Sequence, residues 1–307
     1  MADRVEIVEV SPRDGIQNEG VILSTEAKLA LIRRAAAAGA GRIEVTSFVN
    51  PKRVPQMADA DAVCAGLAAI RAEGFGARFV GLVLNARGFA RAQAAGGLDE
   101  ANFVVVASDA FNRRNQGVGT FETVGAWAEV AAAAKGGPLR VGVTVGAAFG
   151  CPFEGEVPLD RLLRVVEAVM AHGPHEIALA DTIGVAVPRE VTARVGAIRA
   201  RFPEVPVRLH LHDTRNTGVA NAWAGVEAGA AALDASFGGV GGCPFAPKAT
   251  GNVATEDLVY MLERSGVACG VDLGAAIAAA AWLEGVLGHP VPGSVMKAGS
   301  FPAPRAA

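Results

Sequence analysis

The chain has 307 residues, of which 51% are hydrophobic and 19% charged, with a formal net charge of −3. This composition excludes a disordered chain and is typical of a compact fold with a large core. No block of basic residues is present to follow a phosphate backbone, which argues against nucleic acid as a partner.

The four cysteines, Cys64, Cys151, Cys243 and Cys269, have no C-x-x-C spacing and indicate reduced thiols. The N-terminus lacks a basic region followed by an apolar region. No uninterrupted apolar run reaches the roughly 18 to 20 residues that a membrane helix needs. We therefore expect a cytoplasmic protein with no membrane partner.

Short β-rich runs alternate along the chain with segments of helical periodicity. One such segment, residues 24–41, begins with Ser and Thr and ends with glycine, as helix start and stop signals require. The β-rich runs are residues 5–10, 42–48, 78–84, 101–107, 139–146, 175–181, 207–213 and 231–239. Eight repeats of strand and helix predict an α/β fold, the (β/α)₈ TIM barrel.

A doubly wound open sheet is the alternative architecture. It is weaker because the turn after the first run, SPRDGIQNEG, contains no G-x-G-x-x-G. From residue 254 onwards the sequence indicates two or three helices and then a Pro/Gly-rich tail. We expect one barrel domain over residues 1–285, with a small helical C-terminal extension and a tail over 286–307.

A TIM barrel carries its functional residues at the carboxyl ends of its strands. The first run is followed by Arg13 and Asp14, which could otherwise form a surface ion pair of little energetic value. Glu44 lies in an apolar run of a strand that helices would cover on the outside, so an inward role is favoured. Asp181 ends the sixth run, and a helix-capping role is the alternative for it.

The seventh run ends in HLHD, where His210 and His212 lie on the same face of a strand, because strand side chains alternate. After the eighth run, a glycine-rich loop holds Cys243 and ends at Asn252. Cys243 could be a buried small hydrophobe and Asn252 a helix cap. The glycines around Cys243 favour an accessible thiol instead.

Together these residues form a more informative set than any one of them. Two imidazoles, a carboxylate and an amide oxygen suit Mg²⁺, Mn²⁺ or Zn²⁺ with positions left open for substrate. The predicted ligands are Asp14, His210, His212 and, as the fourth, Asn252. A nearby arginine suits a developing oxyanion, and a thiol in a loop can carry a proton.

These residues also carry a family resemblance. The segments EVSPRDGIQNE, IEVTSFVNPKRVPQM, LADTIGV, HLHDT and GGVGGCPFAPKATGNVATEDLVYML resemble 3-hydroxy-3-methylglutaryl-CoA lyase, of the DRE-TIM metallolyase superfamily, from about residue 5 to about residue 285. The loop with Cys243 is the most specific part, and it argues against the related synthases. The resemblance implies metal ligands at Asp14, His210, His212 and Asn252.

The resemblance also implies catalytic roles, at Arg13, Glu44, Asp181, His210 and Cys243. The implied reaction is metal-dependent retro-aldol cleavage of 3-hydroxy-3-methylglutaryl-CoA to acetyl-CoA and acetoacetate. His210 or Asp181 is the base, Arg13 stabilises the enolate, and Cys243 protonates it. Glu44 orients Arg13 or a water at the metal.

One segment departs from the family pattern. After HDT the lyase typically continues with Tyr-Gly, whereas this chain has Arg215, Asn216 and Thr217. A cation at Arg215 could recognise a carboxylate placed differently, so citramalyl-CoA or methylmalyl-CoA is an alternative substrate. For the CoA phosphates the chain offers Arg113 and Arg114, whose alternative is a solvated loop.

Two rivals to an acyl-CoA lyase are a condensing synthase and a non-catalytic scaffold barrel. A scaffold would be expected to have lost a ligand or catalytic position, and none is missing. A homo-oligomer and a place in leucine degradation are further expectations, the second from the resemblance alone.

Overall fold

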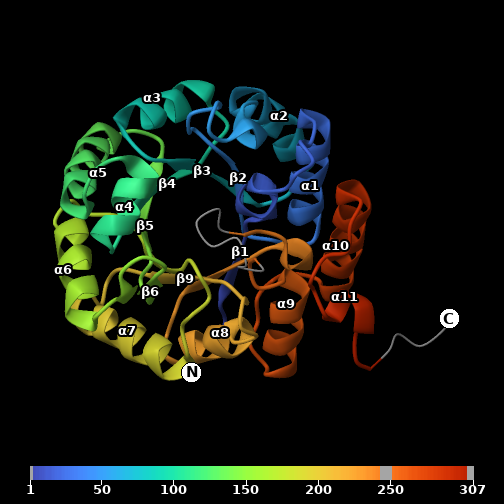
Figure 1. The fold of residues 1–307 in the computed structure, drawn as a ribbon. Helices are drawn as coiled ribbons and strands as arrows, with labels where there is room; N and C mark the ends of the chain where they lie inside the picture. Colours follow the sequence, from blue (N-terminus) through green and yellow to red (C-terminus); the bar gives the residue numbers. More distant parts are fainter. Residues whose placement is uncertain (1–2, 243–250, 303–307) are drawn as a thin grey trace.

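The computed structural model describes residues 3–242 and 251–302. Eight parallel strands close into a barrel in the order β1, β10, β9, β8, β5, β4, β3, β2 (Figure 1). The strands are β1 (Glu6–Glu9), β2 (Arg42–Ser47), β3 (Arg78–Val83), β4 (Glu100–Val106), β5 (Arg140–Gly146), β8 (Ile177–Asp181), β9 (Val207–Leu211) and β10 (Ala232–Ala235). The predicted (β/α)₈ barrel is confirmed, and each strand falls within or overlaps a predicted run.

Helices surround the barrel on its outer side (Figure 1). Several begin at a side chain that accepts a hydrogen bond from the first turn, as Ser24 does from the Ala27 amide. The helices are α1 (Thr25–Ala37), α2 (Ala60–Ala72), α3 (Ala86–Ala95), α4 (Asp109–Gln116), α5 (Thr120–Ala134), α6 (Leu159–Met170), α7 (Pro188–Arg201), α8 (Gly218–Glu227), α9 (Thr255–Arg264), α10 (Leu273–Leu287) and α11 (Val295–Ala298). None of the helices in the described ranges is long and apolar enough to cross a bilayer.

The C-terminal extension consists of α10 and α11. Helix α10 packs against α1 and α9, and α11 packs against α9 and α10. Helix α10 ends at Leu287, so it runs two residues past the predicted boundary at 285. The extension therefore lies against the outside of the barrel beside its first and last helices (Figure 1).

Two local features were not predicted. Residues Ser11–Gly15 form a single π-helical turn, η1, and Gly150–Cys151 (β6) pairs with Gly155–Glu156 (β7) as a short antiparallel hairpin. A Cβ atom on Gly15 would lie 2.7 Å from the Ser236 hydroxyl oxygen, so only glycine permits this close approach of η1 to the end of β10. The turn sets the direction of the side chains that follow β1.

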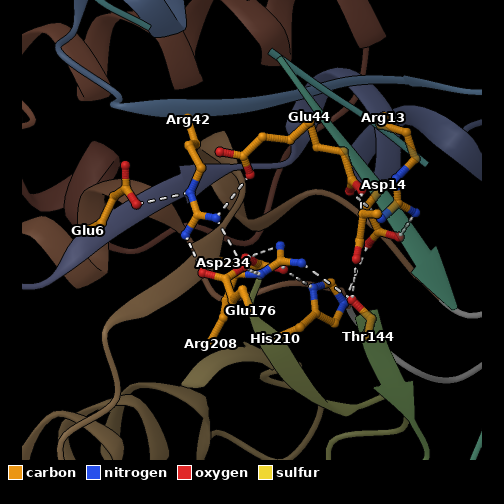
Figure 2. Close-up of polar contacts among 12 residues, drawn as sticks. Glu6, Arg13, Asp14, Arg42, Glu44, Thr144, Glu176, Arg208, His210 and Asp234 are labelled. Carbon is orange, nitrogen blue, oxygen red and sulfur yellow. Dashed lines mark hydrogen bonds and ion pairs between the residues drawn. The ribbon is translucent and has the colours of Figure 1, made fainter. Parts of the chain in front are cut away.

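Ion pairs cross the inside of the barrel. Glu176 accepts hydrogen bonds from Arg42, at 2.7 and 2.9 Å, and forms an ion pair with Arg208 at 2.8 Å. Arg208 in turn binds Asp234 (Figure 2). Because each of these four side chains has a partner of opposite charge, the barrel tolerates them where an apolar core would be usual.

Candidate active site

A cavity of about 1040 Å³ opens at the carboxyl ends of the strands. This is the end of a TIM barrel at which function is expected. Polar residues from the first turn and four strands line its inner part, namely Arg13, Asp14, Asn102, Thr144, His210, His212 and Asp234. Four arginines line it as well, namely Arg53, Arg87, Arg91 and Arg114.

Three predicted metal ligands converge in this cavity. One ligand atom from each of Asp14, His210 and His212 lies within 4.8 Å of the others. Nε2 of His210 is 3.2 Å from Nε2 of His212 and 3.8 Å from a carboxylate oxygen of Asp14. The alternation of β9 and the turn η1 therefore bring together residues that lie about 200 positions apart in the sequence.

Asn252, the predicted fourth ligand, adjoins this cluster. Its amide nitrogen donates to Asp14 at 2.8 Å and to the Val240 carbonyl at 3.1 Å. Its backbone forms a β-bridge with His212. The side-chain oxygen of Asn252 is buried and accepts no hydrogen bond from the described residues.

The protonation states of Asp14 and His212 suit a cation. Burial alone would raise the pKa of Asp14, but Arg13 and the two histidines hold it well below its usual range. Burial and the neighbouring His210 lower the pKa of His212 to about 4, so its imidazole is neutral at pH 7. Burial opposes the charged form of His210 too, yet its hydrogen bond to Asp234 leaves its pKa raised.

A divalent cation fits these residues. Two imidazole nitrogens, an ionised carboxylate and an unpartnered amide oxygen form the mixed donor set that Mg²⁺, Mn²⁺ and Zn²⁺ accept. The unpartnered oxygen of Asn252 supports a ligand, because buried polar atoms normally find a partner.

Arg13 is fixed beside the cluster by two carboxylates. Its Nε and one terminal nitrogen donate to the same oxygen of Glu44, at 2.8 and 2.5 Å, and its other terminal nitrogen donates to Asp14 at 2.5 Å (Figure 2). Despite burial, these carboxylates raise the pKa of Arg13. Glu44 is buried and contacts Arg13, which is the first of the two roles predicted for it.

Asp234 is a site residue that the sequence analysis missed. Its carboxylate accepts the Nδ1–H of His210 at 3.0 Å and two hydrogen bonds from Arg208. The available signals were a carboxylate inside the apolar run AALDASF, as for Glu44, and the position of Arg208 two residues before His210 on one face of β9.

Asp181 ends β8 as predicted, but its carboxylate binds the backbone. One oxygen accepts the Val185 amide and the other accepts the Ala186 amide, both at 2.9 Å. Burial raises the pKa of Asp181. Asp181 is also absent from the described residues that line the cavity. These contacts match the capping alternative, and the catalytic role stays a prediction.

The segment that departs from the family pattern packs against the loop after β8. One terminal nitrogen of Arg215 donates to the carbonyls of Ile183 and Gly184, at 2.9 and 2.8 Å. Asn216 has a left-handed backbone with φ of 55°, and Thr217 is the N-cap residue of α8, without a side-chain capping hydrogen bond. None of the three is among the described residues that line the cavity, so their role in specificity stays a prediction.

The two arginines predicted for CoA differ in position. Arg114 lines the cavity and lies 3.9 Å from the ring centre of Phe153, whereas Arg113 is absent from the described lining. Arg53 and Arg87 also line the cavity and were missed, because exposed arginines in loops and first helical turns carry no distinctive sequence signal.

Cys243 lies outside the described residues. The residue before it, Gly242, lines the cavity, and its carbonyl accepts a hydrogen bond from the Asn18 side chain at 2.7 Å. The described part of the chain therefore reaches the edge of the cavity one residue before Cys243.

Comparisons with known proteins show the family of this chain. The HMGL-like family model matches residues 4–282. The (R)-citramalyl-CoA lyase of Chloroflexus aurantiacus is 47% identical over 97% of this chain and 95% of the relative. Hydroxymethylglutaryl-CoA lyase YngG of Bacillus subtilis is 40% identical over 94% of this chain and 95% of the relative.

Solved structures are similar over the whole barrel. An HMG-CoA lyase from Acinetobacter baumannii, in complex with coenzyme A and 3-methylmalate, has a TM-score of 0.91 at 37% identity and covers 99% of this chain and 98% of its own. The Bacillus subtilis HMG-CoA lyase has a TM-score of 0.91 at 39% identity and covers 97% and 99%.

Proposed function

Because the chain belongs to the HMGL-like family of carbon–carbon lyases, we propose that it cleaves a short 3-hydroxyacyl-CoA by a divalent-metal-dependent retro-aldol reaction. The observation that carries this proposal is the meeting of Asp14, His210 and His212 beside a fixed Arg13 at one wall of the cavity. That arrangement could stabilise both negative charges of the reaction, the one on the deprotonated hydroxyl and the one on the thioester enolate.

Asp14, His210, His212 and Asn252 would hold the cation, which would supply Lewis acidity that lowers the pKa of the substrate hydroxyl. Arg13 lies next to that point and cannot swing away, because Glu44 and Asp14 hold its guanidinium from two sides. A fixed cation stabilises the negative charge that develops on the thioester enolate as the carbon–carbon bond breaks.

The hydroxyl proton needs an acceptor in the cavity. Of the two predicted bases, His210 lines the cavity, whereas both oxygens of Asp181 are engaged by backbone amides. Nε2 of His210 has one lone pair, which can ligate the cation or accept the proton but cannot do both at once, and either use requires Nδ1–H to be held by Asp234. We propose His210 as the base, with Asp14, His212 and Asn252 holding the cation while Nε2 accepts the proton.

The enolate of acetyl-CoA must then gain a proton at carbon. We propose Cys243 as the donor, on the strength of the family motif around it and of the position of Gly242 at the cavity edge.

Two acyl groups fit the family. The sequence predicts 3-hydroxy-3-methylglutaryl-CoA, which gives acetyl-CoA and acetoacetate. (R)-Citramalyl-CoA, which would give acetyl-CoA and pyruvate, is the second candidate, and the 47% identity to a lyase of that name against 40% for YngG favours it. The missing Tyr-Gly after HDT, where the chain has Arg215, points the same way.

The test is a cleavage assay with purified protein and Mg²⁺ on both thioesters, with acetyl-CoA release followed with and without EDTA. We expect chelator-sensitive release from at least one substrate. No release from either with Mg²⁺, Mn²⁺ or Zn²⁺ would contradict the proposal. Cytoplasmic location, homo-oligomer formation and leucine degradation remain predictions.

A further inference from the structure

Of the β5 residues that line the cavity, only Thr144 has a side chain larger than that of glycine. Thr144 and Gly146 line the cavity, and strand alternation puts Gly142 on the same face. Thr144 is half-buried, whereas the other residues from Val141 to Gly146 are buried. The Thr144 side chain therefore faces the cavity between two glycines.

Small side chains flank Thr144 on its β8 side. Register places Thr144 beside Ala178 of β8, and the next inner residue of that strand, Ala180, lines the cavity. On the β4 side, register places Thr144 beside Val104, which also lines the cavity. Thr144 is therefore the largest β5 side chain among the described residues that line the cavity.

The position of Thr144 is fixed by hydrogen bonds to both sides. Its hydroxyl donates to the Asn102 side-chain oxygen at 3.0 Å. It accepts a hydrogen bond from Arg208 at 3.4 Å (Figure 2). Asn102 donates to Glu44, which accepts from Arg13. Arg208 donates to Asp234, which holds His210. Thr144 therefore connects two chains of hydrogen bonds, one leading to Arg13 and the other to His210.

We propose that Thr144 is a specificity-determining residue that limits the length of the acyl group, with Asn102 as its positioning residue. This inference rests on the proposed function, whose two candidate substrates differ by one methylene between the hydroxyl-bearing carbon and the carboxylate. One methylene in a fitted pocket typically changes kcat/KM about 10- to 200-fold. A side chain of different volume at position 144 should change the preference by a factor in that range.

The test compares kcat/KM for 3-hydroxy-3-methylglutaryl-CoA and (R)-citramalyl-CoA in the native protein and three variants. Thr144→Ser enlarges the pocket and should raise the ratio of the longer to the shorter substrate about tenfold. Thr144→Leu should lower that ratio by a similar factor. Thr144→Val keeps the volume and removes the hydroxyl, so it should lower both rates with the ratio within about threefold of the native value.

A ratio that stays within about threefold in both Thr144→Ser and Thr144→Leu, in variants that melt like the native protein, would overturn the inference. Thr192→Val, on the exposed side of α7, is the matched control. Calorimetry with citramalate and 3-hydroxy-3-methylglutarate, in the presence of CoA and Mg²⁺, gives a second readout. If the native protein cleaves neither thioester, the proposed function fails, and an unchanged ratio of the two Kd values in Thr144→Leu then overturns the inference as well.

Discussion

The carboxylate of Asp234 holds Nδ1 of His210 at 3.0 Å while Nε2 of the same ring points toward His212 and Asp14. Burial opposes the ionisation of Asp234, but Arg208 and His210 lower its pKa, so the carboxylate is ionised and Nδ1 must carry the proton. When the imidazole is neutral, the lone pair of His210 is therefore on Nε2, which faces the other ligands. Asp234 fixes both the tautomer and the ring orientation.

Replacing Asp234 with Asn should weaken metal binding. The amide cannot accept from both Arg208 and His210 as the carboxylate does, and loss of such an outer partner typically costs about 10- to 100-fold in metal affinity. Calorimetric titration with Mn²⁺ measures the effect. Glu167→Gln removes an exposed carboxylate paired with Arg201 and serves as the control. An unchanged Kd for Mn²⁺ would mean that Asp234 only neutralises Arg208.

The divalent cation should stabilise the fold. A ligand that binds only the folded protein at 100 times its Kd adds about 2.7 kcal/mol to the free energy of unfolding. The Tm of the native protein should therefore fall when EDTA replaces Mg²⁺ or Mn²⁺. Asp14→Asn removes the one carboxylate of the cluster and should abolish the difference, whereas His289→Ala, at an exposed histidine, should retain it. A native Tm that does not respond to any of the metals would contradict the site.

The sequence was enough to group the residues of the candidate metal site. The barrel follows from the strand–helix alternation, and a barrel brings strand ends together whatever their separation in the chain, so Asp14, His210 and His212 could be grouped without coordinates. The contact between Glu44 and Arg13 followed from the same logic, because a carboxylate inside a covered strand must find a partner.

The inner layer could not be predicted as fully. Strands of a parallel barrel are buried on both faces, so hydrophobic alternation does not tell which face of β4 or β5 points inward. Asn102, Thr144 and Asp234 depend on that choice and on the register between strands. The turn η1, which aims Arg13 and Asp14, is irregular and has no periodic signal.

Asp181→Asn should test the structural role of that carboxylate. An amide has one acceptor oxygen for two backbone amides, so one of the Val185 and Ala186 N–H groups loses its partner. A buried unsatisfied donor costs about 1 to 3 kcal/mol, which urea unfolding would detect. If stability is unchanged while kcat falls by more than about a thousandfold, Asp181 is the base and our preference for His210 is wrong.

Glu9 should make stability depend on pH. It is fully buried, and burial raises its pKa to about 7, although the Thr255 hydroxyl and the Ser11 and Phe237 amides donate to it. The folded protein therefore binds a proton more tightly than the unfolded chain does. This contribution is fully present below pH 4.5 and is lost as pH rises through about 7.

Glu9→Gln mimics the protonated form and should remove this dependence. Relative to the native protein, the variant should gain about 2 to 3 kcal/mol in free energy of unfolding between pH 5 and pH 8, since one pKa unit corresponds to 1.36 kcal/mol. Urea unfolding at several pH values in EDTA measures it, with Glu129→Gln, at an exposed position, as the control. Parallel pH profiles for Glu9→Gln and the native protein would show that Glu9 stays ionised.

Neighbouring arginines on α4 offer a matched pair for the CoA contact. Arg114 lines the cavity, and Phe153 under its guanidinium restricts its motion. Arg113 instead lies 4.0 Å from Glu122 at the surface. Loss of one charge-assisted contact to a phosphate costs about 1.5 kcal/mol, so Arg114→Gln should raise KM roughly tenfold with little change in kcat.

Arg113→Gln should leave both constants near the native values, because the removed charge faces Glu122 and solvent. The salt dependence of KM provides a second readout. Exposed charge pairs are screened by added salt, so the native KM should rise between 50 and 300 mM NaCl more steeply than that of Arg114→Gln. Equal salt slopes, or equal KM values for the two variants, would place the CoA phosphates elsewhere on the rim, where Arg53 and Arg87 are the remaining exposed arginines of the described lining.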